Sequence, residues 1–147
     1  MNKAAMQTIT ADEIEKILGE IYPYYDKDKR SVINDVPFNI PDMQMLKELV
    51  SRNSVKHIKQ TKKFQCEERA LTLLSKIRND FDYSRYNEYE FNLDIGMVGG
   101  IKHVGLPRGA HMRLLSITDE GVVTIEPFND KIEKSDNDKF SIFNLWM

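Results

Sequence analysis

Three side chains of this 147-residue sequence have the types and the order that nucleophilic thiol chemistry requires. Cys66, the single cysteine, stands in FQCEERA, and His111 and Glu126 follow within GAHMRLLSITDEGVVTIEPFND. A thiolate attacks a carbonyl carbon when a histidine takes its proton and a carboxylate orients that histidine. Cys66 is therefore a candidate nucleophile, His111 a candidate base and Glu126 a candidate orienting group. A lone cysteine is also a common core residue, so composition alone does not decide the role of Cys66.

A helix expected over residues 64–81 positions the cysteine. The apolar side chains of FQCEERALTLLSKIRNDF recur at helical spacing, and Glu67 and Glu68 suit the first turn of a helix. Cys66 then lies at or near the helix N-terminus, close to Lys62 and Lys63. A helix N-terminus and nearby cations both favour the thiolate over the thiol.

A hairpin expected over residues 111–126 positions the other two candidates. If TDEG, residues 118–121, is a four-residue loop, Ile117 pairs with Val122 and Arg113 stands opposite Glu126. His111 then lies diagonally across from Glu126 on the same face of the sheet. A register slip of one residue would place the two on opposite faces.

The remaining patterns predict an α+β fold, with helices first and an antiparallel sheet after them. Thr10 and Glu13 fit a capping box, which predicts a helix over residues 10–21, and DMQMLKELVSR predicts a second helix over 42–52. Residues 22–40 are expected to be irregular with one short strand. Strands are expected over residues 89–97, 111–117, 122–126 and 140–146. We expect one domain, 1–147, with residues 1–54 as an N-terminal helical extension and 55–147 as the core.

Charge and hydropathy exclude two classes of partner. Lys plus Arg number 21 and Asp plus Glu 23, so a net charge of -2 gives no global attraction for nucleic acid. The sequence shows neither a signal peptide nor an apolar stretch of the roughly 20 residues that a membrane span requires. We therefore expect a cytoplasmic protein that binds neither nucleic acid nor a membrane.

The order of Cys66, His111 and Glu126-Pro127 resembles the papain-like cysteine peptidase fold in a minimal form. More closely, it is similar to the family that includes the C-terminal domain of the Marasmius fungal agglutinin and small phage and bacterial proteins. The resemblance covers roughly residues 55–147 and implies a hydrolase, a cysteine peptidase or amidase with a Cys-His-Glu triad. Its partner would be a protein or peptide substrate.

The same resemblance implies further site residues. Papain-like enzymes carry an oxyanion-binding glutamine six residues before the cysteine, the position of Gln60, and Gln65 competes for that role. The agglutinin relatives use calcium, and this sequence offers hard oxygen ligands without the spacing of a known calcium loop. No other cofactor is expected. The low-priority calcium ligands are Glu67, Glu68, Asp94, Asn129 and Asp130.

Two alternatives compete with this interpretation. The segment IKHVGL resembles the histidine segment of the NlpC/P60 cell-wall peptidases, which makes His103 the alternative base, although Pro107 and Gly109 interrupt the pattern. The other alternative is a non-catalytic phage or bacterial protein, an inhibitor that captures a partner on the same scaffold. Tyr22, Tyr24 and Tyr25 would then contribute to the partner surface.

Overall fold

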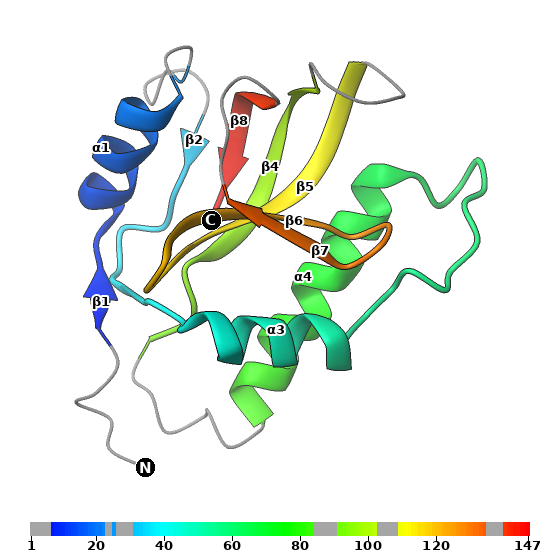
Figure 1. The fold of residues 1–147 in the computed structure, drawn as a ribbon, viewed down its shortest axis with the longest axis horizontal. Helices are drawn as coiled ribbons and strands as arrows, with labels where there is room; N and C mark the ends of the chain where they lie inside the picture. Colours follow the sequence, from blue (N-terminus) through cyan, green and yellow to red (C-terminus); the bar gives the residue numbers. More distant parts are fainter. Residues whose placement is uncertain (1–6, 23–24, 26–30, 84–90, 103–108, 135–139) are drawn as a thin grey trace.

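The fold is α+β, with helices packed around a curved antiparallel sheet (Figure 1). The structure is a computed structural model, and it describes residues 7–22, 25, 31–83, 91–102, 109–134 and 140–147. Within these residues, the order of elements agrees with the predicted succession of helices followed by strands.

The predicted helices are all present, and each begins where its sequence signal places it. Helix α1 (Ala11–Ile21) starts after Thr10, whose side chain and that of Glu13 form the predicted capping box. Helix α3 (Met43–Arg52) starts after Asp42, which accepts a hydrogen bond from the Met45 N–H at 2.7 Å. Helix α4 (Cys66–Tyr83) begins at the cysteine itself.

Among the described residues, the strands form a small sheet and a large one. The small sheet pairs β1 (Thr8–Ile9) with β3 (Phe38–Asn39). The large sheet has the order β2-β8-β4-β5-β6-β7, antiparallel throughout except that β2 runs parallel to β8. Its strands are β2 (Ser31–Val32), β4 (Ile95–Lys102), β5 (Gly109–Thr118), β6 (Gly121–Glu126), β7 (Lys131–Lys134) and β8 (Phe140–Trp146).

The sheet differs from the sequence expectation at its edges. Strand β4 begins at Ile95, later than the predicted start at Tyr89, which lies outside the described residues. Strand β7 was not predicted, because KIEK is short and mostly charged and carries no apolar alternation. The two-residue strands β1, β2 and β3 are also too short to leave a periodic signal.

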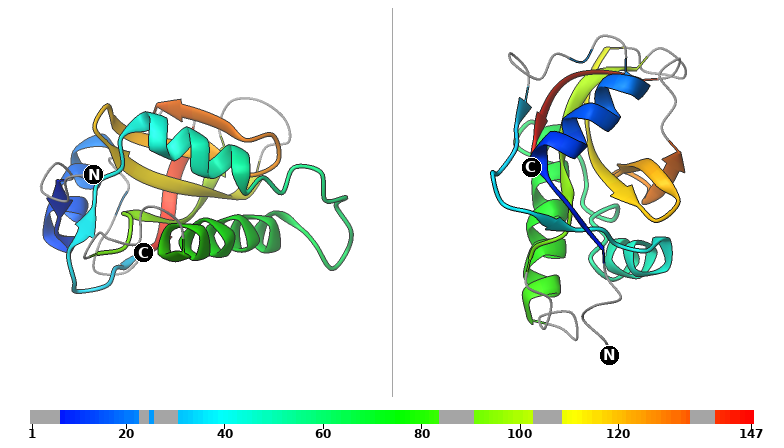
Figure 2. Two further views of the ribbon diagram at one scale, coloured as in Figure 1. Left: turned by 90° about the horizontal axis from the view of Figure 1, so that it is seen from below. Right: turned by 90° about the vertical axis from the view of Figure 1, so that its left-hand side faces the viewer.

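Two apolar clusters stabilise the fold on the two faces of the large sheet. One cluster joins α3 and α4 to sheet residues that include Leu114, Val123 and Ile125. The other joins α1 to sheet residues that include Leu115 and Val122. Figure 2 shows α1 at the end of the molecule away from α4, so the two clusters are separate. The alternation of side chains along β5 and β6 therefore decides which cluster each residue joins.

The first 54 residues contribute to the same sheet and the same core as the rest of the chain. Strand β2 pairs with β8, and α3 packs on α4, where Arg52 forms an ion pair with Asp80 at 2.7 Å. The division into an extension, 1–54, and a core, 55–147, stays a prediction. Within the described residues, none of the helices is long and apolar enough to cross a membrane.

Candidate functional site

His111 and Glu126 meet across the predicted hairpin. Ile117 pairs with Val122 and Thr118 with Gly121, which confirms the expected register of β5 and β6. His111 Nε2 lies 2.7 Å from Glu126 Oε2, a hydrogen bond between the diagonal pair. The turn itself is closed by Thr118, whose hydroxyl donates to the Gly121 carbonyl at 2.9 Å.

Other polar side chains of β5, β6 and β7 surround this pair. Arg113 Nε lies 3.2 Å from Glu126 Oε2, and Arg113 Nη1 donates to the Thr124 hydroxyl at 3.3 Å. Arg113 Nη1 also lies 3.9 Å from Glu133 Oε2 on β7. We call this group, His111, Arg113, Thr124, Glu126 and Glu133, the sheet-end cluster. Because Arg113 and Thr124 are buried, their polar atoms depend on these partners.

The electrostatics of the cluster favour an ionised Glu126. Burial by itself raises the pKa of this carboxyl. The hydrogen bond from His111, the charges of His111 and Arg113 and the backbone N–H of Phe128 outweigh that effect and hold the pKa of Glu126 below its ordinary value of 4.5. The cluster therefore presents a fixed carboxylate, oriented by two basic side chains.

The sheet-end cluster lies on the face of the sheet that carries the α1 cluster. His111, Arg113 and Glu126 alternate with Leu114 and Ile125, whose side chains pack toward α4. Helix α1 itself lies beside β2 and β8, far from β7, as Figure 1 shows. The described helices therefore leave this end of the face uncovered, and the His111 side chain stays 26% exposed.

The start of α4 reaches the turn between β6 and β7 through a buried arginine. The Arg69 guanidinium lies 5.2 Å from the centre of the Phe128 ring and 5.1 Å from that of Phe64. It also donates to the carbonyl of Val55 at 2.7 Å and to that of Ile58 at 2.6 Å. Arg69 thereby fixes the loop before α4 against the turn that follows Glu126.

Cys66 lies at the first residue of α4 and is partly exposed. It is therefore in the same region as the turn after Glu126, which Arg69 contacts one helical turn later. The structure records no hydrogen bond from the Cys66 thiol to His111 or Glu126. It thus brings two of the three predicted site residues together and leaves the inclusion of Cys66 a prediction.

The predicted grouping of Cys66 with His111 can be tested by alkylation. If the imidazole takes the thiol proton, His111→Ala slows the reaction of Cys66 with iodoacetamide by about tenfold near pH 7. Mass spectrometry of the intact protein measures the rate, since the chain has one cysteine. His57→Ala, in the exposed loop before α4, is the matched control. Equal rates in the native protein and the His111 variant would show that Cys66 acts apart from the pair.

The remaining candidates for hydrogen bonding to a substrate are placed as follows. Gln60 is exposed in the loop between α3 and α4. Gln65 is also exposed, and its side chain donates to the Lys62 carbonyl at 3.3 Å. Neither glutamine is recorded in contact with the sheet-end cluster. His103, the alternative base, lies outside the described residues.

The calcium ligands considered from the sequence are divided among three places. Glu67 and Glu68 lie at the start of α4, where Glu68 accepts a hydrogen bond from the Gln65 N–H at 3.0 Å. Asn129 and Asp130 lie in the turn between β6 and β7, and Asp94 is fully buried. In the part of the chain that the structure describes, no three His, Cys, Asp or Glu side chains are grouped as metal ligands.

Asp94 is a buried acid with one oxygen satisfied. Its Oδ1 accepts from the Ser116 hydroxyl at 2.9 Å, while Oδ2 is buried without a hydrogen-bond partner among the described residues. Burial raises the pKa of Asp94 well above its ordinary value of 3.8, although hydrogen bonds from Ser116 and the Ile117 backbone oppose the shift. Because a buried charge is costly, the folded protein is more stable when this carboxyl is protonated and neutral.

Asp94→Asn is therefore expected to stabilise the protein at high pH. Because the folded-state pKa is raised, the native protein is most stable below pH 3.8 with respect to this group and loses stability as the pH rises toward the folded value. The neutral amide removes that loss, a gain of about 1 to 2 kcal/mol near pH 8. Urea unfolding across pH measures it, with the exposed Asp35→Asn as control. A variant that is less stable at every pH would contradict the expectation.

Sequence reasoning missed the residues that complete the site. Glu133 lies on the unpredicted strand β7. Arg69 gave a weak signal, a charged residue at a position that the helix pattern places toward the core, three residues after Cys66. Phe128 was visible only as an aromatic residue after Glu126-Pro127, and the structure shows it 56% exposed.

Comparison with known proteins shows the fold of the chain. No family model matches the sequence, and no curated protein matches it. The solved structures similar to it include two that match over 95% of its length. One is PSL1a in complex with E64, at a TM-score of 0.77 and 14% identity. The other is Polyporus squamosus lectin bound to the epitope Neu5Aca2-6Galb1-4GlcNAc, at a TM-score of 0.75 and 16% identity.

These neighbours contradict the family resemblance drawn from short motifs. The two neighbours named above are structures of a lectin, which contradicts the assignment to a papain-like hydrolase or thiol protease. A protein or peptide substrate is contradicted as well, because one of these structures is named with a glycan epitope as its ligand, while the other is named with E64. The alternative of an NlpC/P60-like peptidase is contradicted on the same ground, whereas the alternative of a non-catalytic binding or inhibitor protein stays a prediction. Motifs of a few residues occur by chance in many folds, which is why they misled.

Proposed function

We propose that the protein binds carbohydrate at the sheet-end cluster and Phe128. The observation that carries the proposal is an exposed aromatic ring beside a part-buried carboxylate that His111 and Arg113 hold in place. The fold shared with a lectin supports it. The chain spans about half the length of each of these chains, 50% and 49%.

The cluster has the chemistry that a sugar requires. A sugar ring has an apolar C–H face and a rim of hydroxyl groups. The exposed ring of Phe128 offers a surface for the C–H face, and Arg69 supports the ring from beside it at 5.2 Å. Glu126 accepts hydrogen bonds from hydroxyl donors, while His111 and Glu133 are partly exposed and within the same cluster. Because the carboxylate is already oriented, binding costs little reorganisation.

The proposal is tested by calorimetric titration of the purified chain with Galβ1-4GlcNAc and its sialylated form. We expect millimolar to micromolar binding, about -4 to -8 kcal/mol, which Phe128→Ala weakens by about tenfold or more. Leu71→Ala, another exposed apolar side chain on the outside of α4, is the matched control.

The same titration separates the outcomes. Loss of binding in the Phe128 variant alone supports the site. Binding that survives both substitutions would place the sugar elsewhere. No heat of binding in the titration, together with no binding on a broad glycan array, would contradict the proposal. The experiment therefore asks whether the half of the lectin fold present in this chain is sufficient to hold a sugar.

A further inference from the structure

We infer that β7 is a self-complementary sheet edge, and that two copies of the chain associate by antiparallel pairing of β7 with β7. The partner is therefore a second copy of this chain, and Ile132 lies opposite the partner's Ile132. The inference follows from the place of β7 in the sheet and from the order of the charges along it. It does not depend on the proposed function.

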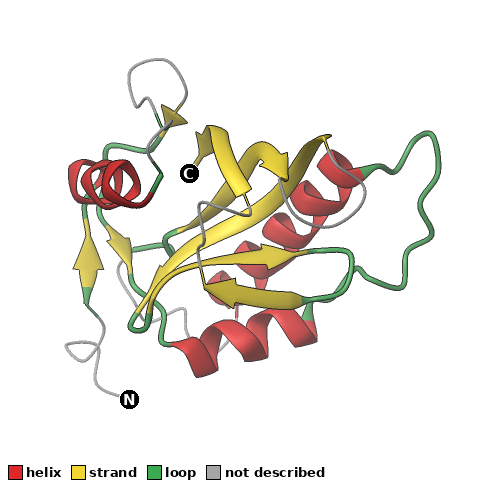
Figure 3. Ribbon diagram, turned by 45° about the horizontal axis from the view of Figure 1, so that its top comes forward, coloured by secondary structure: helices red, strands yellow, loops and turns green. Residues whose placement is uncertain are grey.

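Strand β7 lies at one end of the large sheet. Among the described strands it pairs with β6 alone, and Figure 3 shows it at the border of the sheet. In an antiparallel ladder, alternate residues direct their backbone N–H and C=O groups toward the neighbouring strand, and the others direct them outward. The outer groups of β7 therefore have the arrangement that a further strand requires.

The side chains of β7 are divided between the two faces of the sheet. Lys131 and Glu133 stand opposite Glu126 and Thr124, so they belong to the face that carries the sheet-end cluster. Ile132 faces the other way and packs against the apolar cluster that joins α3 and α4. The side chains of Lys131 and Glu133 are 65% and 35% exposed. Both charges are therefore accessible to a second chain.

The charges of β7 complement one another in one antiparallel register. When Ile132 lies opposite the partner's Ile132, Lys131 lies opposite the partner's Glu133 and Glu133 lies opposite the partner's Lys131. Lys134 then lies next to the turn of the other copy, which carries the acidic Asp130. Opposite charges on directly opposed residues stabilise a strand pair. This register therefore sets two Lys–Glu pairs around an Ile–Ile pair.

The neighbouring registers bring like charges together. A shift by one residue in one direction places Lys131 opposite the partner's Lys134. The same shift in the other direction places Asp130 opposite the partner's Glu133, and shifts by two residues oppose Glu133 or Lys131 to its own counterpart. Like charges on directly opposed residues destabilise a strand pair. Edge charges usually prevent pairing, and here they oppose every register within two residues except the one centred on Ile132.

The pairing joins the two large sheets into one. Directly opposed residues of an antiparallel pair lie on the same face, so the two sheet-end clusters lie on one face of the joined sheet. The partner's Lys131 then lies beside Glu133, which already contacts Lys131 at 3.0 Å and Arg113 at 3.9 Å. A twofold axis at Ile132 relates the copies, so the association closes as a dimer.

Sedimentation velocity of the purified chain tests the association. Because a strand pair of four residues buries little surface, we expect a dissociation constant of about 10 to 100 µM in about 50 mM salt. In about 500 mM salt the constant should increase by about fivefold or more, because the paired charges are exposed and salt screens them.

Two charge-reversing variants test the register. Lys131→Glu opposes glutamate to glutamate across the pair, and Glu133→Lys opposes lysine to lysine. Each variant alone should dissociate about tenfold more readily than the native chain. In an equimolar mixture the two variants are complementary, so a heterodimer should form with an affinity close to the native one. Lys131 is exposed, so Lys131→Glu still decides the inference if Glu133→Lys, which lies near Arg113, does not fold.

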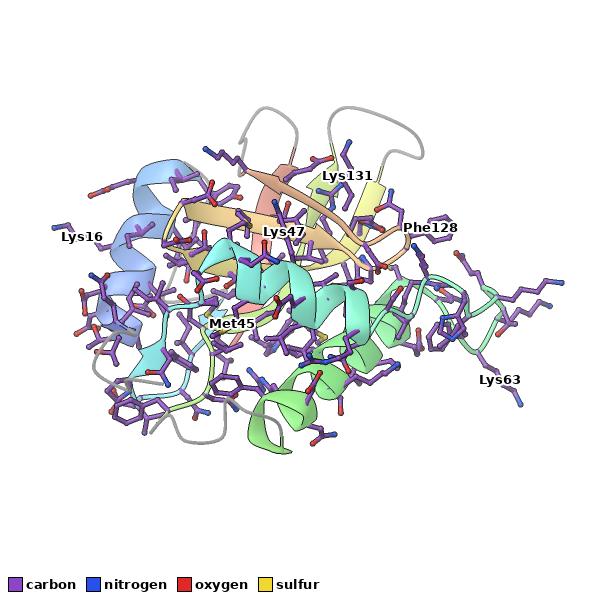
Figure 4. All side chains as sticks on the ribbon, turned by 60° about the horizontal axis from the view of Figure 1, so that its bottom comes forward. Lys16, Met45, Lys47, Lys63, Phe128 and Lys131 are labelled. Carbon is purple, nitrogen blue, oxygen red and sulfur yellow. The ribbon has the colours of Figure 1, made fainter. Side chains whose placement is uncertain are left out.

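Lys16→Glu is the matched control for these variants. Lys16 is exposed on α1, and Figure 4 shows it on the side of the molecule away from Phe128 and the turn that leads into β7. The substitution makes the same change of charge as Lys131→Glu and should leave the dimer intact. Urea unfolding of each variant shows whether the fold is kept.

Each outcome decides the inference. Separate variants that are monomeric and that form a dimer when mixed support it. A native chain that stays monomeric up to about 500 µM overturns it. A dimer that persists in both variants shows that the copies meet on another surface and also overturns it. Two monomeric variants that do not associate when mixed contradict the register centred on Ile132.

Discussion

We expect Glu126→Gln to lower the free energy of unfolding by about 2 to 3 kcal/mol near pH 7. The substitution keeps the shape of the side chain and removes the charge that faces His111 and Arg113. Arg113 has a side chain that is only 7% exposed, with Glu126 Oε2 3.2 Å away, so it would keep a buried positive charge with weaker compensation. Urea unfolding measures the difference.

The loss of stability caused by Glu126→Gln should become smaller as the pH falls. The pKa of Glu126 in the folded protein lies below its ordinary value of 4.5, so its contribution to stability is present above pH 4.5 and is lost as the pH falls through the lowered value. The difference between the native protein and the variant should therefore shrink in acid. Glu120→Gln, in the exposed turn, is the control. A stability difference between the native protein and Glu126→Gln that stays constant down to strongly acidic pH would contradict the assignment of a negative charge to Glu126.

The second large effect is expected at Gly96. A Cβ atom there would lie 2.3 Å from the Trp146 carbonyl oxygen and 2.4 Å from Met147 Cγ. The methionine side chain can move, but the backbone of β8 can move only if the pairing of β4 with β8 is disturbed. Gly96→Ala should therefore cost more than about 3 kcal/mol, or prevent folding.

Gly19 provides the matched control for this substitution. A Cβ at Gly19 meets nothing within 4 Å, and the residue is exposed in α1. Gly19→Ala should raise stability by about 0.5 to 1 kcal/mol, because alanine loses less backbone entropy in a helix. Thermal and urea unfolding of the two variants compare them directly. A Gly96 variant as stable as the native protein would show that β8 adjusts without cost.

The sequence predicted the parts of the site that depend on near neighbours. The capping box of Thr10 and Glu13 and the start of α4 at Cys66 were local signals, and both are present. The register that brings His111 to Glu126 followed from a short turn, since the two strands are consecutive in the chain. The α+β class followed from the order of these elements.

Other features could not be read from the sequence, since they require segments that only folding brings together. Glu133 reaches Arg113 from a strand with no apolar alternation, and Asp94 is buried by contacts with β5. Asp94, one of the low-priority calcium ligands considered from the sequence, is fully buried, which the sequence did not indicate. The identity of the relatives was also misjudged, because a short motif carries less information than a fold shared over 95% of the chain.

The sequence by itself determined where the helices begin and how the β5–β6 hairpin pairs. Those features depend on side chains within a few residues of one another. The tertiary structure alone decided that Arg69 stacks on Phe128 and joins the start of the loop before α4 to the turn between β6 and β7. Contacts between distant segments form where the two faces of the sheet bury apolar side chains. Each apolar cluster collects residues from many parts of the chain, so no short stretch of sequence shows which segments will meet.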